Sequence, residues 1–150
     1  MSQSRAPLLE TLAYLQLRTI DYPYNFELKN GVRLTLSRWE DLTTAWVVFY
    51  GNEYALKVSD RVIVDCGANV GAFSLLCAAS LPEAKIIAVE PFPATYQQLC
   101  REIESNGHSD RIEPINAAVV GIPGEVMMDD REEIASHSRK IGGQNGIPVQ

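Results

Sequence analysis

The sequence has no long apolar run and no apolar leader. No stretch of about 18 consecutive apolar residues occurs among its 150 residues, so no transmembrane helix is predicted. Residues 1–7 likewise lack the apolar segment of a secretory signal peptide. These two absences predict a cytoplasmic protein without a membrane partner.

Positive charge is also scarce. Lys and Arg number 13 against 19 Asp and Glu, which gives a formal net charge of −6. A nucleic-acid partner is disfavoured, because binding to a phosphate backbone requires clustered Lys and Arg side chains. A small local basic patch is compatible with these numbers.

Cysteine is sparse. The three cysteines, Cys66, Cys77 and Cys100, are odd in number and include no CxxC spacing. They predict neither a disulfide framework nor a zinc site, and no metal is expected. Because all three lie in apolar segments, we expect small buried hydrophobes with reduced thiols.

The first 60 residues predict two helices around a hairpin. Residues 8–17 have loose helical spacing. Apolar and polar residues alternate over 24–28 and again over 32–36, and the Asn30-Gly31 pair between them favours a type I′ turn. A second helix is expected from an N-cap at Asp41 to about Tyr50, with Gly51 placed to end it.

The pattern changes at residue 61. Three strand patterns, at 62–64, 86–89 and 111–120, are separated by two helix patterns, at about 71–81 and 93–106. The uninterrupted apolar run at 62–64 predicts a strand buried on both faces. This order predicts an α/β fold with a parallel, Rossmann-like sheet. We expect the strand order third, second, first, with helices on the faces of the sheet and the hairpin beside it.

The last segment, 122–150, holds four glycines and two prolines, which favour a loop or an irregular hairpin. We therefore divide the chain into an N-terminal part (1–60), a ligand-binding core (61–121) and an irregular tail (122–150). Doubly wound sheets normally have further strands on the other side of the first one. We expect this chain to hold the first half of such a sheet.

The candidate ligand site is the turn Asp65-Cys66-Gly67-Ala68-Asn69-Val70-Gly71, after the first strand. Gly67 permits a tight turn and lets a ligand approach the backbone, and Gly71 lets the helix begin close to the strand. Open α/β sheets bind ligands at this carboxyl end of their strands. The alternative is a purely structural turn.

Glu90 ends the second strand, 23 residues after Gly67. A carboxylate there can accept hydrogen bonds from both hydroxyls of a ribose, in NAD or in S-adenosylmethionine (SAM). The loop favours SAM, because Asn69 stands where a dinucleotide loop has its middle glycine. Asp65 also suits a cationic sulfonium ligand with an amino group and repels phosphates. SAM is therefore the predicted cofactor.

These segments resemble the FkbM-type family of SAM-dependent methyltransferases over about residues 40–120. The family pattern is a D-x-G-A-N-x-G loop, an E-P dipeptide after the second strand and an N-A-A-V segment on the third. The sequence matches it at residues 65–71, at Glu90-Pro91 and at residues 116–119. Asp41 and the Glu53-Tyr54 pair resemble the family's lead-in.

The resemblance implies a class I methyltransferase that acts on a hydroxyl of a small molecule, such as a sugar or polyketide. The predicted cofactor-binding residues are Asp65, Gly67, Ala68, Asn69, Gly71, Glu90, Pro91, Phe92 and Ala117, with Phe92 beside the adenine. Family members continue into a fourth strand, roughly D-x-x-K-I-D-x-E-G, which this sequence lacks. No catalytic base is assigned, and we expect a truncated protein.

Two other classes of function remain open. One is a nucleoside-binding or interaction domain without catalysis, and the other is an NAD-linked oxidoreductase, which the missing glycine disfavours. Four further side chains are expected at the surface or in packing contacts, namely His108, His137, Trp39 and Trp46. Tyr54 fits either the cofactor pocket or a packing role.

The expected open edge of the first strand generates a prediction. Without a fourth strand, residues 62–64 present unpaired backbone groups and apolar area, which promote association. We expect the isolated chain to self-associate, to be marginally stable and to have little methyltransferase activity. Sedimentation and thermal unfolding test this expectation. A monodisperse monomer that melts cooperatively above about 60 °C contradicts it.

Overall fold

The computed structural model describes residues 19, 21–51, 54–122, 124–128 and 147–149. The expected helix at 8–17, together with Glu53 and His137, lies outside them. In chain order the elements are β1 (Tyr24–Glu27), β2 (Arg33–Leu36), α2 (Trp39–Tyr50), β3 (Val62–Cys66), α3 (Ala72–Ser80), β4 (Lys85–Val89), α4 (Pro93–Ser105), β5 (Ile112–Ile115), β6 (Val126–Met128) and β7 (Ile147–Val149).

The central sheet is parallel, in the order β3-β4-β5. Val62 of β3 pairs with Lys85 of β4, and Ile86 of β4 pairs with Ile112 of β5. The helices α3 and α4 connect these strands in turn, which confirms the predicted α/β, Rossmann-like class and the strand order.

The third strand is shorter than the predicted 111–120. It ends at Ile115, because the next side chain turns back toward the neighbouring strand. Asn116 Nδ2 donates to the carbonyl oxygens of Glu90 (2.8 Å) and Pro91 (3.0 Å). These bonds hold the chain after β5 against the end of β4.

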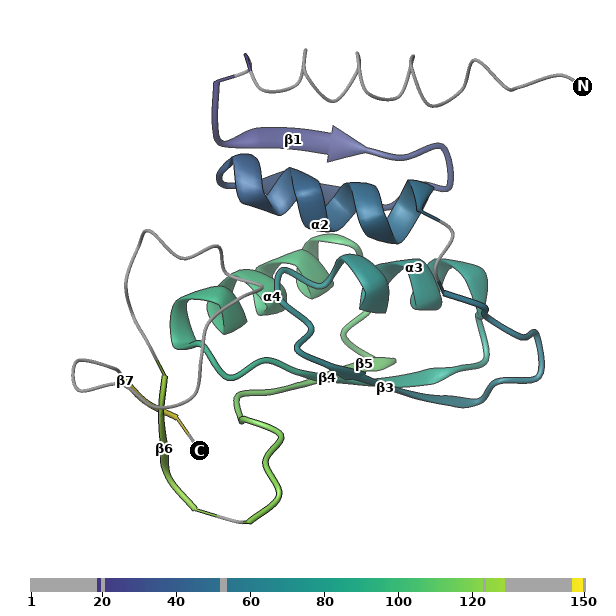
Figure 1. The fold of residues 1–150 in the computed structure, drawn as a ribbon. Coiled ribbons are helices and arrows are strands. Elements are labelled where there is room, and N and C mark those ends of the chain that lie inside the picture. The colour runs from purple at the N-terminus through teal and green to yellow at the C-terminus, as the bar shows by residue number, and fades with distance from the viewer. Residues whose placement is uncertain (1–18, 20, 52–53, 123, 129–146, 150) are drawn as a thin grey trace, which may run out of the picture.

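Both helices of the core lie on the same face of the sheet (Figure 1). Ile86 and Ile112 point to this face and are buried, as are Leu75 of α3 and Leu99 of α4. The prediction of helices on both faces is therefore wrong for the part of the chain that the structure describes.

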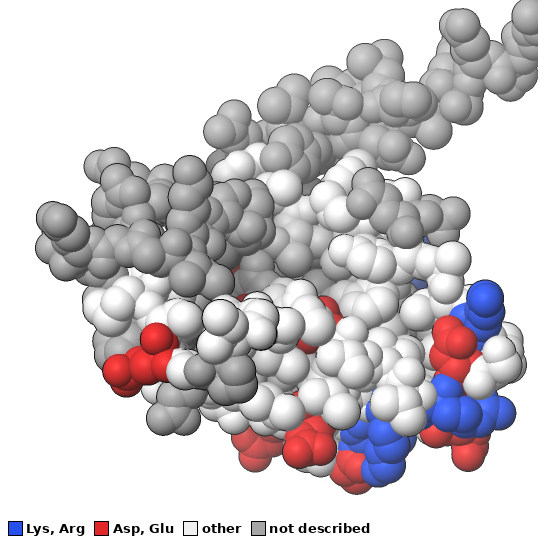
Figure 2. Space-filling model, turned by 60° about the horizontal axis from the view of Figure 1, so that its bottom comes forward, with Lys and Arg blue, Asp and Glu red and all other residues white. Residues whose placement is uncertain are grey.

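The opposite face of the sheet is open to solvent and largely apolar, with Glu113 as a charged exception. The side chain of Val62 is 66% exposed and that of Val64 is 55% exposed, so the prediction that this strand is buried on both faces is also wrong. Figure 2 turns this side forward and shows uncharged side chains over much of it. An uninterrupted apolar run is typical of strands that are buried on both faces. Burial of the second face also requires helices or strands that pack against it, and the run alone does not provide them.

The hairpin lies over the helices rather than beside the sheet, which corrects the prediction (Figure 1). Val32, just before its second strand, and Leu34 and Leu36 of that strand are buried in the core shared with the helices. Its turn is not type I′, because Gly31 (φ 85°) has a left-handed backbone and Asn30 does not. The N–H of Leu28 instead donates to the Val32 carbonyl (2.9 Å), which closes a three-residue loop.

A row of side chains on α4 hydrogen-bonds the outer edge of β2. Gln98 Nε2 donates to the Thr35 carbonyl (2.7 Å), and Glu102 Oε1 accepts from the Thr35 N–H (3.1 Å). Asn106 accepts from the Arg33 N–H (2.8 Å) and donates to the Arg33 carbonyl (2.7 Å). The four-residue spacing places these three side chains on one side of the helix. Their hydrogen bonds take the place of those that a neighbouring strand would make with the edge of β2.

The helix α2 begins earlier than predicted. Its N-cap is Arg38, and Asp41 is the third helical residue. Asp41 Oδ2 accepts from the backbone N–H groups of Ser37 (2.7 Å) and Arg38 (3.1 Å), so it still satisfies donors at the helix start. Gly51 ends the helix as predicted, and a Cβ there would lie 2.6 Å from the Val47 carbonyl oxygen.

In the segment after residue 121, for which a loop or an irregular hairpin was predicted, β6 and β7 pair antiparallel. Among the described residues, no helix has both the length and the apolar character needed to cross a lipid bilayer.

The burial of Glu102 generates a stability prediction. Its side chain is 3% exposed, and desolvation raises its pKa above the ordinary 4.5 while the hydrogen bond from Thr35 acts in the opposite direction. Glu102 therefore binds a proton more tightly in the folded state than in the unfolded state. Its contribution to the free energy of unfolding is full at low pH and falls as the pH rises above about 4.5.

Glu102→Gln removes the charge and keeps an acceptor oxygen for Thr35. We expect it to raise the free energy of unfolding at pH 7 by about 1 kcal/mol and to leave it nearly unchanged at pH 4. Urea unfolding at both pH values measures this, with Glu104→Gln as an exposed control on the same helix. An equal effect at both pH values would show that the charge of Glu102 carries no such cost.

Candidate functional site

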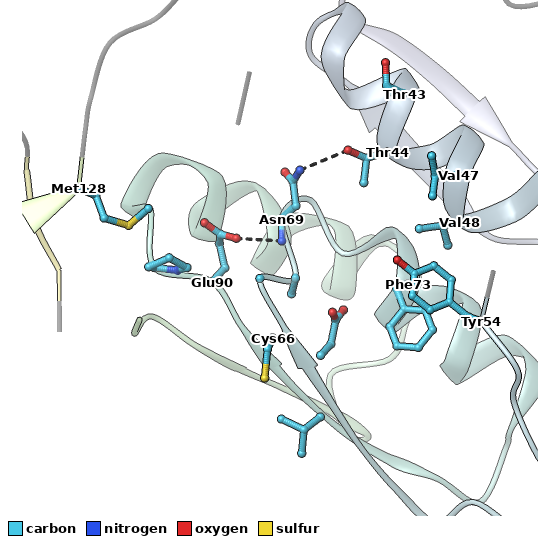
Figure 3. A pocket seen from close by; sticks show the side chains of 15 residues that line it. Thr43, Thr44, Val47, Val48, Tyr54, Cys66, Asn69, Phe73, Glu90 and Met128 are labelled. Carbon is cyan, nitrogen blue, oxygen red and sulfur yellow. Dashed lines mark hydrogen bonds between the residues drawn. The ribbon is translucent and has the colours of Figure 1, made fainter. Parts of the chain in front are cut away.

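A cavity of about 680 Å³ opens at the carboxyl ends of β3 and β4 (Figure 3). Five parts of the chain line it: Thr43, Thr44, Val47 and Val48 from α2; Tyr54, which precedes β3; Val64, Asp65, Cys66, Gly67, Ala68, Asn69 and Phe73 from β3 to α3; Glu90 and Pro91 after β4; and Met128 of β6. Parallel strands with intervening helices create this kind of crevice at their carboxyl ends.

The turn after β3 depends on three left-handed residues, Gly67 (φ 80°), Asn69 (φ 51°) and Gly71 (φ 89°). A Cβ on Gly67 would meet nothing within 4 Å, so this glycine serves the backbone conformation and leaves the cavity open. A Cβ on Gly71 would lie 2.7 Å from Leu99 Cδ1. Gly71 thus allows the start of α3 to approach α4, where the sequence had suggested a close approach to the strand.

The backbone donors of this turn are used within the protein. The N–H groups of Gly67 (2.8 Å) and Ala68 (2.9 Å) both donate to the Val89 carbonyl, and the Asn69 N–H donates to Glu90 Oε2 (2.9 Å). Loops that bind pyrophosphate direct such N–H groups at the ligand instead. This turn is therefore built for a different ligand chemistry.

Asp65 belongs to β3, and its carboxylate lies at the N-terminus of α3. Its Oδ2 accepts from the Ser74 hydroxyl (2.7 Å), and its carboxylate also accepts from the Ser74 backbone N–H. The side chain is buried, and desolvation raises its pKa while the bonds from Ser74 oppose that rise. The position at which a helix N-terminus would attract a phosphate is thus filled by the protein's own carboxylate.

Glu90 connects the two strand-to-helix turns. Oε2 accepts from the Asn69 N–H, and Oε1 accepts from the Phe92 N–H (2.9 Å). These two bonds orient a buried carboxylate at the cavity wall. A carboxylate offers about four acceptor positions and can accept several hydrogen bonds at once, including bonds from hydroxyl groups.

The helix α2 is joined to the turn through Asn69. The Asn69 Nδ2 donates to Thr44 Oγ1 (3.4 Å), and this pair is seen in Figure 3. On the same side of the cavity, the ring centroids of Tyr54 and Phe73 are 4.4 Å apart. Of the two roles left open for Tyr54, the structure thus shows both a cavity position and a packing contact.

The structure brings six of the predicted site residues to the cavity wall: Asp65, Gly67, Ala68, Asn69, Glu90 and Pro91. Gly71, Phe92 and Ala117 do not line it. Phe92 is buried at the N-cap of α4, and Ala117 follows β5. A contact of any of these nine residues with a cofactor stays a prediction.

Sequence reasoning missed the part of the wall that comes from α2 and from Met128. Thr43 and Thr44 are two polar residues between Leu42 and Ala45, which is a weak signal, and nothing in the sequence pairs Met128 with the loop after the first strand. Cys66 was expected to be buried but is exposed at the cavity. His108, expected at the surface, is half-buried with its Nδ1 3.2 Å from Arg111 Nη2.

The charge of the wall is uniform. Asp65 and Glu90 line the cavity, and no Lys, Arg or His is among the residues described as lining it. Two carboxylates in a partly desolvated cavity attract a cation and repel an anion more strongly than they would in water. The site is therefore suited to a ligand that carries positive charge.

Comparison with known proteins gives two curated relatives, and no family model matches the chain. Methyltransferase sdnD of Sordaria araneosa is 41% identical over 64 residues, which are 43% of this chain and 24% of that protein. Methyltransferase 1 of Beauveria bassiana (strain ARSEF 2860) is 42% identical over 45 residues, 30% of this chain and 18% of that protein. The matches thus span less than a quarter of each relative.

Solved structures give weaker likenesses. The TYW2 protein of P. horikoshii in complex with MeSAdo is 29% identical with a TM-score of 0.45, over 65% of this chain and 37% of that one. The SAM-dependent methyltransferase of Agrobacterium tumefaciens is 14% identical with a TM-score of 0.43, over 65% and 33%. At these scores the likenesses carry no weight for function.

The two glycines of the turn generate a prediction. Gly67→Ala places an alanine in a left-handed backbone conformation but creates no steric clash, so it should lower the free energy of unfolding by about 1 kcal/mol. Gly71→Ala adds a clash with the buried Leu99 and should cost about 2–4 kcal/mol. Urea unfolding of the two variants measures both values. Equal losses would mean that the approach of α3 to α4 does not depend on Gly71.

Proposed function

We propose that this chain forms the SAM-binding part of a class I methyltransferase of the FkbM type. The observation that carries the proposal is the carboxylate of Asp65 at the N-terminus of α3, bonded to Ser74, in a cavity with a second buried carboxylate and no cationic lining residue. SAM carries a sulfonium and an ammonium group and has no phosphate, so its charge complements this wall.

The same features disfavour a dinucleotide. The pyrophosphate of NAD would approach the Asp65 carboxylate at the start of α3, which repels it. It would also meet the Gly67 and Ala68 N–H groups, which already donate to Val89. The oxidoreductase alternative therefore lacks both the charge and the donors that it needs.

In the proposed complex, Glu90 accepts hydrogen bonds from the two ribose hydroxyls and fixes the position of the nucleoside. Asp65 attracts the cationic end of the ligand and turns it toward β3. When bound, SAM supplies an electrophilic methyl group for a single in-line displacement. The contribution of these residues is to hold the ligand in one orientation, which lowers the entropic cost of reaching the reactive geometry.

The acceptor is proposed from the sequence pattern. The D-x-G-A-N-x-G loop with Glu90-Pro91 resembles FkbM-type enzymes, which implies a hydroxyl group of a small molecule such as a sugar or polyketide. Both curated relatives are named methyltransferases, in agreement with this class. The apolar α2 side of the cavity, with Val47 and Val48, is compatible with an uncharged acceptor.

Calorimetry tests the cofactor assignment. Loss of a carboxylate that binds two hydroxyls costs about 1.5–3 kcal/mol, so Glu90→Ala should weaken SAM binding by about 10- to 150-fold, and the unaltered chain should bind SAM much more tightly than NAD. Glu113→Ala is the matched control, because Glu113 is exposed on the open face of the sheet. Unchanged SAM affinity in a folded Glu90→Ala protein would remove Glu90 from the site.

Turnover tests the activity. A panel of hydroxylated small molecules with labelled SAM should yield methylated product if the chain catalyses transfer by itself. Cofactor binding without any turnover would instead support the alternative of a nucleoside-binding domain without catalysis.

A further inference from the structure

The cavity has two chemically different ends. Met128 lies at one end, and the ring pair of Tyr54 and Phe73 lies at the other, with Glu90 between them (Figure 3). Asp65 is bonded to Ser74, the neighbour of Phe73 on α3, so it belongs to the Phe73 side of Glu90. The wall therefore has the order Met128, Glu90, Asp65, aromatic pair.

We propose that the Met128 side chain forms the wall against which the adenine ring of SAM packs. The proposal rests on the proposed function, because it takes Glu90 as the ribose site. In SAM the ribose stands between the base and the sulfonium. With the ribose at Glu90 and the positive charge at Asp65, the base points away from Asp65, toward Met128 and Pro91.

The chemistry of Met128 suits this role. Its side chain is 7% exposed, although it stands on a short strand outside the parallel sheet. A thioether is flexible and polarisable and makes favourable contacts with aromatic rings. The next residue back, Met127, is 39% exposed, because successive side chains of a strand point to opposite sides. The strand β6 thus belongs to the cofactor site and determines which base fits it.

The reverse orientation is less favourable. It would place the base between Tyr54 and Phe73, whose rings can also contact a purine. The sulfonium would then lie at the Met128 end, away from the Asp65 carboxylate and beside a thioether. This separation forgoes the attraction between the two charges.

Methyl NMR of the intact chain tests the position of the base. The protein contains three methionines, Met1, Met127 and Met128, so labelling of the methionine methyl carbons gives at most three signals. Met127→Leu and Met128→Leu assign them. Adenosine should shift the Met128 signal through the ring current of the base and leave Met127 unmoved. Free methionine should not shift Met128, and a shift by methionine alone would establish the reverse orientation.

Calorimetry provides the second measurement. Met128→Ala should weaken the binding of adenosine and of SAM by the same factor, about 2- to 10-fold. The affinities of Met128→Leu should stay within about 2-fold of those of the unaltered chain, because leucine has a similar volume. Met127→Ala is the matched control and should have no effect, and thermal unfolding confirms that each variant is folded.

The outcomes separate the two proposals. If the unaltered chain binds SAM but adenosine leaves the Met128 signal in place, the assignment of Met128 is wrong and the proposed function stands. If the unaltered chain binds neither SAM nor adenosine, both are overturned.

Discussion

The hydrogen bond from the Asn69 N–H to the Glu90 carboxylate joins the two halves of the site. It connects the turn after β3 to the end of β4, and the Phe92 N–H on the other carboxylate oxygen connects it to α4. The αL conformation of Asn69 aims its backbone at Glu90, and its side chain reaches Thr44 on α2. The shape of the cavity depends on this junction, because α2, the turn and β4 all meet there.

Charge then decides what the cavity can hold. Asp65 accepts from both donors of Ser74 at the start of α3, so the dipole of that helix stabilises a protein carboxylate instead of a bound anion. Together with Glu90 it gives a negative wall. In the proposed function, methyl transfer would convert the sulfonium of the ligand into an uncharged thioether. The attraction between the wall and the ligand would then weaken after the reaction, which would favour release of the product.

The sequence predicts the local backbone features of this protein better than the packing of its helices and strands into layers. The left-handed turn at Gly67 and the position of Glu90 at the end of a strand are apparent in the pattern itself, whereas the contact of Gly71 with α4 is not. The run at 62–64 indicated burial on both faces, but Val62 and Val64 are exposed, because burial depends on what packs against a strand. The walls supplied by Thr44 and Met128 arise from long-range contacts without a spacing signal.

The central claim is that Asp65 makes the site selective for positive charge. The most direct test compares the affinity of the chain for SAM with its affinity for S-adenosylhomocysteine, the neutral thioether, in the unaltered protein and in Asp65→Asn. The ratio of the two affinities should fall by about tenfold in the variant, because both ligands carry the ammonium group but only SAM loses the attraction between its sulfonium and Asp65, worth about 1.4 kcal/mol. An unchanged ratio in a folded variant that still binds both ligands would contradict the account.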